Sequence, residues 1–314
     1  MADPARLGAR GRRSLGVAVM AYGTPASPAD VEAYYTHIRR GNAPTPDQLA
    51  DLVRRYDAIG GTSPLAERTE AQRAGLEAAL EERAPGRCRV VLGQKHAAPF
   101  IEDAAAALAA EGVEAIVGLV LAPHFSRSSV GQYQERLATA AAEHGLAVGG
   151  VESWHLEPTY LAFLTSAVRH ALEPLPARTK VLFTAHSLPE RVLVDDPYPD
   201  QLRASATAVA EAAGLHRWAG WALGWQSAGR TPEPWRGPDI LETLRDLAAT
   251  GRADGVLVCP QGFVSDHLEV VYDLDIEARK LADELGLAFA RTRVLNDDSA
   301  VLGALADRVL AAAP

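Results

Sequence analysis

Three carboxylates recur at four-residue intervals toward the end of the chain. They are Glu269, Asp273 and Glu277, and on a helix residues at i, i+4 and i+8 lie along one face. Like charges at this spacing repel each other, so a solvated acidic face is the ordinary interpretation of such a row. Here the apolar Val270 and Leu274 leave little of the helix free to face water. Carboxylate oxygens bind hard and borderline divalent cations, so the alternative is a site for a hydrated cation such as Fe(II).

Histidines stand where three of the expected strands end. Ligands of open parallel sheets bind outside the carboxyl ends of the strands, which makes His96, His124 and His186 candidates for a shared site. Tyr22 follows the first expected strand at the same kind of position. One such histidine alone is usually a hydrogen-bonded loop residue, but three that converge would carry chemistry. An imidazole beside the carboxylate row would complete a site for Fe(II) or a similar ion.

A second kind of site, for anions, is indicated in the first half of the chain. Arg39–Arg40 and Arg54–Arg55 are paired arginines in an otherwise acidic protein, and Ser63 follows in a glycine-rich loop. Guanidinium and hydroxyl groups bind carboxylates through charge-assisted hydrogen bonds, although surface arginines are common without any ligand. The sequence has no Walker A loop, no G-x-G-x-x-G turn, no H-E-x-x-H zinc motif and no G-x-S-x-G nucleophile elbow.

These residues need elements that bring distant parts of the chain together. Short β-rich apolar runs alternate with alanine-rich amphipathic segments, a pattern that predicts an α/β fold of parallel sheets flanked by helices. The expected strands are Leu15–Met20, Arg87–Leu92, Ala115–Leu121, Ala147–Val151, Lys180–Thr184, Trp218–Leu223, Gly255–Cys259 and Leu287–Arg291. The expected helices include Asp103–Glu111, Val130–His144, Asp200–Ala213, Asp239–Thr250 and Ser299–Ala312.

The two halves of the chain resemble each other. A strand runs into Tyr22-Gly23-Thr24-Pro25 in the first half and into His186-Ser187-Leu188-Pro189 in the second. With 314 residues, the chain is long enough for two domains of ordinary size. We therefore expect two similar α/β domains. The divisions are a basic tail over 1–14, an N-terminal domain over 15–155 and a C-terminal domain over 156–314.

Charge and cysteine content exclude several classes of protein. The chain has 31 Lys and Arg against 40 Asp and Glu, a formal charge of −9, whereas nucleic-acid-binding proteins are usually basic. Its two cysteines are too few for a disulfide framework or a four-thiolate metal site, which indicates a reducing compartment. No apolar run reaches the ~18 residues of a membrane span, and no signal-peptide cleavage pattern follows the basic N-terminus. We expect a cytoplasmic protein with no nucleic-acid partner and no stable membrane insertion.

Longer motifs, taken in order along the chain, resemble those of the ferrochelatases. The resemblance runs from about residue 15 to the C-terminus. It is carried by residues 19–25, 34–41, 55–65, 185–189, 196–199, 224–227, 232–235 and 262–269. The block Tyr-Tyr-Thr-His-Ile-Arg-Arg-Gly at 34–41 is most similar to the water-soluble Gram-positive form of the family, which inserts iron into coproporphyrin III.

The resemblance implies a reaction and a set of roles. The family inserts Fe(II) into a free-base porphyrin with release of two protons, without an organic cofactor, in a cleft between two Rossmann-like domains. His186 and Glu269 match the catalytic pair that handles iron. Asp273 and Glu277 continue its acidic row on a helix with a π-bulge. Tyr22 matches a tyrosine on the opposite face of the macrocycle that can ligate product iron. The residues matched to porphyrin binding are Tyr22, Arg39, Arg55, Tyr56, Ser63 and Tyr133.

We expect His186 to accept a pyrrole proton, because an imidazole with a pKa near neutrality suits that step. Glu269 would then stabilise the imidazolium. Some actinobacterial relatives hold a [2Fe–2S] cluster in cysteines, but for Cys88 and Cys259 we expect buried thiols and no cluster. We also expect a monomer that hands its product transiently to a downstream haem-synthesis enzyme. Two alternatives are a cobalt or nickel chelatase of another tetrapyrrole, such as sirohydrochlorin, and a non-catalytic coprohaem carrier.

Overall fold

The computed structural model describes residues 15–216, 220–229 and 231–314, and it contains two parallel four-stranded sheets. Their strand orders, β2-β1-β3-β4 and β6-β5-β7-β8, are the same winding repeated, which confirms the predicted likeness of the two halves. The first sheet consists of β1 (Leu15–Ala21), β2 (Cys88–Gln94), β3 (Ala115–Val120) and β4 (Ala147–Val151). The second consists of β5 (Thr179–His186), β6 (Trp221–Gln226), β7 (Gly255–Cys259) and β8 (Ala288–Arg291).

All eight strands lie where the apolar runs predict them. The expected tail over 1–14 and the expected start of one strand at 218 lie outside the described residues. The four central strands, β1, β3, β5 and β7, are buried on both faces, so their side chains alternate between two cores. Val19 and Leu119 belong to a core that also contains Phe183 of the second sheet, whereas Met20 and Leu182 face separate cores on the outer sides. One continuous core therefore joins the two halves.

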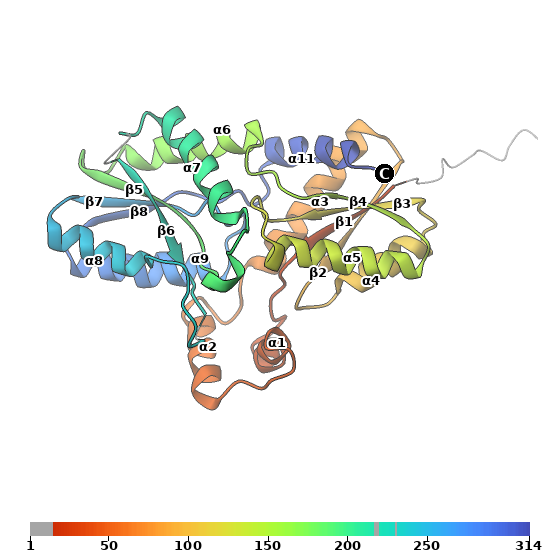
Figure 1. The fold of residues 1–314 in the computed structure, drawn as a ribbon, viewed down its shortest axis with the longest axis horizontal. Coiled ribbons are helices and arrows are strands. Elements are labelled where there is room, and N and C mark those ends of the chain that lie inside the picture. The colour runs from red at the N-terminus through yellow and green to blue at the C-terminus, as the bar shows by residue number, and fades with distance from the viewer. Residues whose placement is uncertain (1–14, 217–219, 230) are drawn as a thin grey trace, which may run out of the picture.

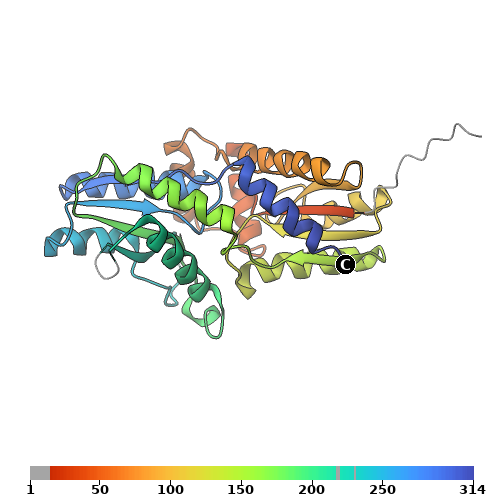
Figure 2. The ribbon, with the colours of Figure 1, turned by 90° about the horizontal axis from the view of Figure 1, so that it is seen from above.

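Helices flank both sheets, as Figures 1 and 2 show. In the first half these are α1 (Val31–Ile38), α2 (Pro46–Ala58), α3 (Leu65–Arg83), α4 (Ile101–Ala110) and α5 (Gln132–Glu143). In the second half they are α6 (Pro158–Leu172), α7 (Tyr198–Ala213), α8 (Ile240–Thr250), α9 (Leu268–Val270), α10 (Arg279–Glu284) and α11 (Ser299–Ala311). Short 3-10 turns lie at Pro28–Asp30 and Glu190–Val192, and π-helical turns lie at Arg127–Gly131 and Val271–Ala278. Within the described residues, no helix combines the length and apolarity needed to cross a membrane.

One helix near the C-terminus connects the halves. The C-terminal helix α11 returns to the first half and packs against α3, while it also touches α6 (Figure 2). On the other side of the molecule, α1 and α2 stand clear of both sheets at the bottom of the view in Figure 1. The division at residue 155 therefore remains a prediction, because the chain beyond it contributes a helix to the surroundings of the first sheet.

Candidate active site

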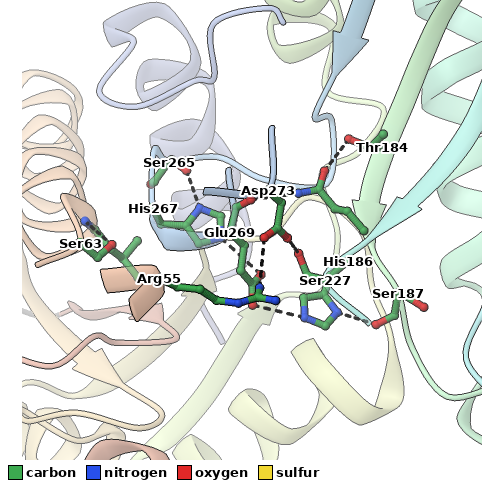
Figure 3. A network of polar contacts seen from close by, with 12 residues as sticks. Arg55, Ser63, Thr184, His186, Ser187, Ser227, Ser265, His267, Glu269 and Asp273 are labelled. Atoms are coloured by element: carbon green, nitrogen blue, oxygen red, sulfur yellow. Dashed lines mark hydrogen bonds and ion pairs between the residues drawn. The ribbon is translucent and has the colours of Figure 1, made fainter. Parts of the chain in front are cut away.

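His186 is the last residue of β5 and lies at the carboxyl end of the second sheet. Its Nδ1 donates to the carbonyl of Ser187 at 2.5 Å, which leaves Nε2 to face Glu269 at 3.5 Å (Figure 3). The side chain of His186 is 35% exposed and that of Glu269 is 36% exposed, so solvent reaches both. The structure thus brings the predicted catalytic pair together from two separate elements.

Glu269 lies between two imidazoles. Its second oxygen is 3.5 Å from Nε2 of His267, whose Nδ1 donates to the carbonyl of Ser265 at 2.9 Å. His267 was not among the predicted site residues. On a regular helix, residues two apart face different directions, but the backbone at His267 is extended (φ −156°, ψ 179°) and α9 begins only after it. The available signal was its position two residues before Glu269, just ahead of the helix.

The charges of this pair differ from the expectation. Burial disfavours the imidazolium of His186, but the attraction and hydrogen bond of Glu269 outweigh burial and raise the pKa of His186 from 6.5 to about 9. Burial likewise opposes the ionisation of Glu269, yet His186 and His267 hold the pKa of its carboxyl well below 4.5. The expected near-neutral pKa of His186 was therefore wrong for the substrate-free protein. At pH 7 the pair is an imidazolium next to a carboxylate.

The acidic row continues into the π-helix Val271–Ala278, so the expected departure from regular α-helix is present. In a π-helix each turn holds more residues than in an α-helix, which keeps residues four apart closer to one face. Asp273 is buried there. Burial and the charge of Glu269 raise the pKa of Asp273 to about 7, against the lowering effect of Ser227 and Arg55. Glu277 is half-buried, and its charge also contributes to this rise.

Both carboxylate oxygens of Asp273 have partners. Oδ2 accepts a hydrogen bond from Ser227 at 2.5 Å, and Oδ1 lies 3.4 Å from Nη1 of Arg55. Ser227 was not among the predicted site residues, although it follows the end of β6 and is the last residue of the motif at 224–227. It adopts a left-handed conformation (φ 61°), which a serine seldom does and which belongs to the turn that places it against Asp273.

The charge of Glu269 acts on two tyrosines of the first half. Tyr22 follows β1 and is 44% exposed, with its ring centroid 4.6 Å from that of His96. Desolvation and then the charge of Glu269 raise the pKa of Tyr22 well above 10. The same two causes raise the pKa of Tyr56 to about 12, with a partial offset from a hydrogen bond to Thr24. The carboxylate that pairs with His186 in the second half is therefore close enough to act on both of these tyrosines.

Comparison with known proteins decides the family. The sequence profile of the ferrochelatases matches residues 14–313. The coproporphyrin III ferrochelatase of Bacillus subtilis (strain 168) is 43% identical over 95% of this chain and 98% of its own length. That of Halalkalibacterium halodurans is 44% identical over 91% of this chain and 93% of its own length. The chain belongs to the ferrochelatase family.

Solved structures show that the chain has the two-domain chelatase fold. SirB from Bacillus subtilis with Fe3+ has a TM-score of 0.59 at 13% identity, with 96% of both chains covered. CbiX, described as the terminal enzyme of sirohaem biosynthesis in denitrifying bacteria, has a TM-score of 0.53 at 14% identity, with 96% of this chain and 99% of its own covered. At such identities the likeness concerns the fold alone.

The expected porphyrin-binding residues differ in how far they are buried and in which groups they contact. Ser63 and Tyr133 are buried, at 8% and 4% exposure. Ser63 accepts a hydrogen bond from the Leu65 amide at the start of α3 (3.2 Å), and Nζ of Lys95 lies over the Tyr133 ring (4.9 Å). Arg39 is half-buried at the end of α1, where its Nε donates to the carbonyl of Asn42 at 3.2 Å.

The three strand-end histidines of the ferrochelatase do not all meet. His186 is at the centre of the site and His96 lies beside Tyr22. His124 is 2% exposed, and its Nε2 is 2.8 Å from Oγ of Ser205 in α7. The expected convergence was therefore wrong for His124, because its imidazole is part of a buried polar contact.

Proposed function

We propose that this protein inserts ferrous iron into coproporphyrin III to give Fe-coproporphyrin III, with release of two pyrrole protons. The observation that carries the proposal is the imidazolium–carboxylate pair of His186 and Glu269, which is open to solvent and whose carboxylate raises the pKa of Tyr22 in the other half. The relatives named above as coproporphyrin III ferrochelatases support the choice of porphyrin.

Iron and the proton compete for the same pair of side chains. In the free protein His186 holds a proton because Glu269 is negative. Fe(II) that binds the Glu269 carboxylate offsets that charge, so the pKa of His186 falls and its proton leaves. The neutral Nε2 can then accept the proton of one pyrrole N–H, pass it to solvent and accept the proton of the second, and the two vacated nitrogen lone pairs bind the metal. Ring bending that tilts these lone pairs toward one face is part of the proposed mechanism.

Metal and porphyrin are held by different groups. Asp273 and Glu277 supply carboxylate oxygens along which a hydrated cation reaches Glu269. Tyr22 covers the opposite face of the macrocycle and can ligate the iron of the product. The propionates are bound by residues of the first half, and these guanidinium and hydroxyl groups offset the net charge of −9 locally. They are Arg39, Arg55, Tyr56, Ser63 and Tyr133.

The remaining parts of the proposal concern the setting of the reaction. Cys88 and Cys259 are free and buried, as expected, and lie in different sheets. We propose that they hold no [2Fe–2S] cluster, and that the protein works as a cytoplasmic monomer. The product then passes to a downstream haem-synthesis enzyme by a transient encounter.

The test is an anaerobic mixing assay with Fe(II) and coproporphyrin III, followed by the Soret and visible bands. Acceleration over the protein-free rate is expected, with slower reaction of protoporphyrin IX. Binding of Fe-coproporphyrin III without acceleration would identify a carrier, and faster Co(II) or Ni(II) insertion into sirohydrochlorin would identify the other chelatase. His186→Ala should abolish turnover and leave porphyrin binding intact. The matched control is His170→Ala, because His170 is an 88% exposed imidazole on α6.

A further inference from the structure

Arg55 already has partners for its guanidinium within the protein. It belongs to α2 in the first half, but its Nη1 lies 3.4 Å from Oδ1 of Asp273 in the second half. Its Nε is 3.1 Å from Asp51, and its guanidinium lies 5.0 Å over the ring of Tyr272. The side chain of Arg55 remains 26% exposed, whereas that of Asp273 is 9% exposed. The partly exposed guanidinium of Arg55 therefore lies between solvent and the nearly buried carboxylate of Asp273.

The contact between Arg55 and Asp273 conflicts with the proposed role of each residue. Arg55 is proposed to bind a propionate, and Asp273 is proposed to bind the metal ion. A guanidinium paired with Asp273 and Asp51 is not free to bind a propionate. Its positive charge also stands where a divalent cation must approach the acidic row, and like charges repel. The other oxygen of Asp273 is taken by Ser227, so a metal ion needs the position that Arg55 holds.

We propose that Arg55 is a shared residue that makes the acidic row available to iron only after a porphyrin carboxylate has drawn the guanidinium away from Asp273. The inference rests on the proposed function, because it takes Arg55 as a propionate ligand. A propionate offers a bidentate partner, whereas the contact with Asp273 is a single long one. Movement of the guanidinium away from the row removes one positive charge from beside Asp273. Porphyrin binding and cation binding are then positively coupled, and by linkage each strengthens the other equally.

The coupling can be measured on the wild-type protein without turnover. Mn(II) serves as the metal probe, with unbound Mn(II) counted by EPR, and nickel(II) coproporphyrin III as the carboxylate-bearing porphyrin whose centre is already filled. We expect Mn(II) to bind about tenfold more tightly to the protein saturated with this porphyrin than to the free protein. An Mn(II) affinity that does not change on porphyrin binding overturns the proposal.

Substitutions separate Arg55 from general electrostatics. Arg55→Gln should bind Mn(II) about tenfold more tightly than wild type in the absence of porphyrin, and porphyrin should then add nothing. Arg54→Gln is the matched control, because Arg54 contacts Asp51 and Tyr272 but not Asp273. It removes the same charge from the next position and should leave the coupling within about twofold of wild type. Equal loss of coupling in both variants, or full coupling in Arg55→Gln, overturns the assignment.

Failure of this inference differs from failure of the proposed function. If the protein metalates coproporphyrin III but its Mn(II) affinity is independent of porphyrin, only the sharing of Arg55 is wrong. If nickel(II) coproporphyrin III does not quench the tryptophan fluorescence of the protein and no metalation occurs, the proposed function itself is wrong.

Discussion

His186 holds a proton that faces Glu269, and two opposing effects set the pKa of its imidazole. Burial lowers the pKa of His186, whereas the carboxylate of Glu269 raises it. The effect of the carboxylate is decisive, and the pKa of His186 is about 9. Because this pKa lies above 6.5, the pairing stabilises the fold fully below pH 6.5 and the contribution is lost as the pH rises through about 9. His186 therefore stores a proton, and the charge of Glu269 determines when that proton is released.

Glu269→Gln keeps the size of the side chain and removes its charge. Burial, which has the largest effect on this imidazole, is then opposed only by the Ser187 carbonyl and the charge of Asp273, so the pKa of His186 should fall from about 9 to below its ordinary value of 6.5. A pH titration of the imidazole resonances by NMR measures it. Asp273→Asn is the control and should lower the pKa much less, because Asp273 is the weakest of the contributors. A value that stays near 9 in Glu269→Gln would show that another group holds the proton.

At the scale of elements, the fold was readable in the sequence and the site only in part. Parallel strands buried on both faces are continuous apolar runs, so β1 and β7 could be found from composition alone. The contact of Arg55 with Asp273 could not be found, because it joins positions 218 apart on helices whose relative placement depends on tertiary packing. His267 was missed for a local reason, since the extended backbone before α9 breaks the helical spacing.

Helix α2 holds Arg55 and Tyr56, and its first turn is fixed by a capping box. Oγ1 of Thr45 accepts from the amide of Gln48 at 3.3 Å, and Oε1 of Gln48 accepts from the amide of Thr45 at 3.0 Å. Thr45→Ala removes one of these bonds and should lower the free energy of unfolding by about 1 kcal/mol. Hydrogen exchange should speed up in α2 and not in the strands of either sheet. Uniform acceleration would mean that α2 does not open by itself.

At the scale of the whole molecule, one buried side chain ties the halves together behind the site. Gln72 of α3 is 0% exposed, and its Nε2 donates to the carbonyls of Val264 (3.1 Å) and Asn296 (2.9 Å). Its Oε1 accepts from Oγ of Ser265 at 3.0 Å, and the carbonyl of that serine orients His267. The first half therefore fixes the loop of the second half that leads into Glu269.

Gln72→Leu preserves volume but leaves buried carbonyls and a hydroxyl unpaired, which should cost about 3 kcal/mol in urea denaturation. Because the loop that carries His267 loses its anchor, kcat should fall more than KM rises. Gln134→Leu is the matched control, since Nε2 of Gln134 donates to the carbonyls of Gly118 (3.1 Å) and Val151 (3.4 Å) within the first half. It should destabilise the fold and leave the kinetics of the remaining folded enzyme unchanged. Equal kinetic losses in both variants would mean that stability alone, and not the anchored loop, links the halves to catalysis.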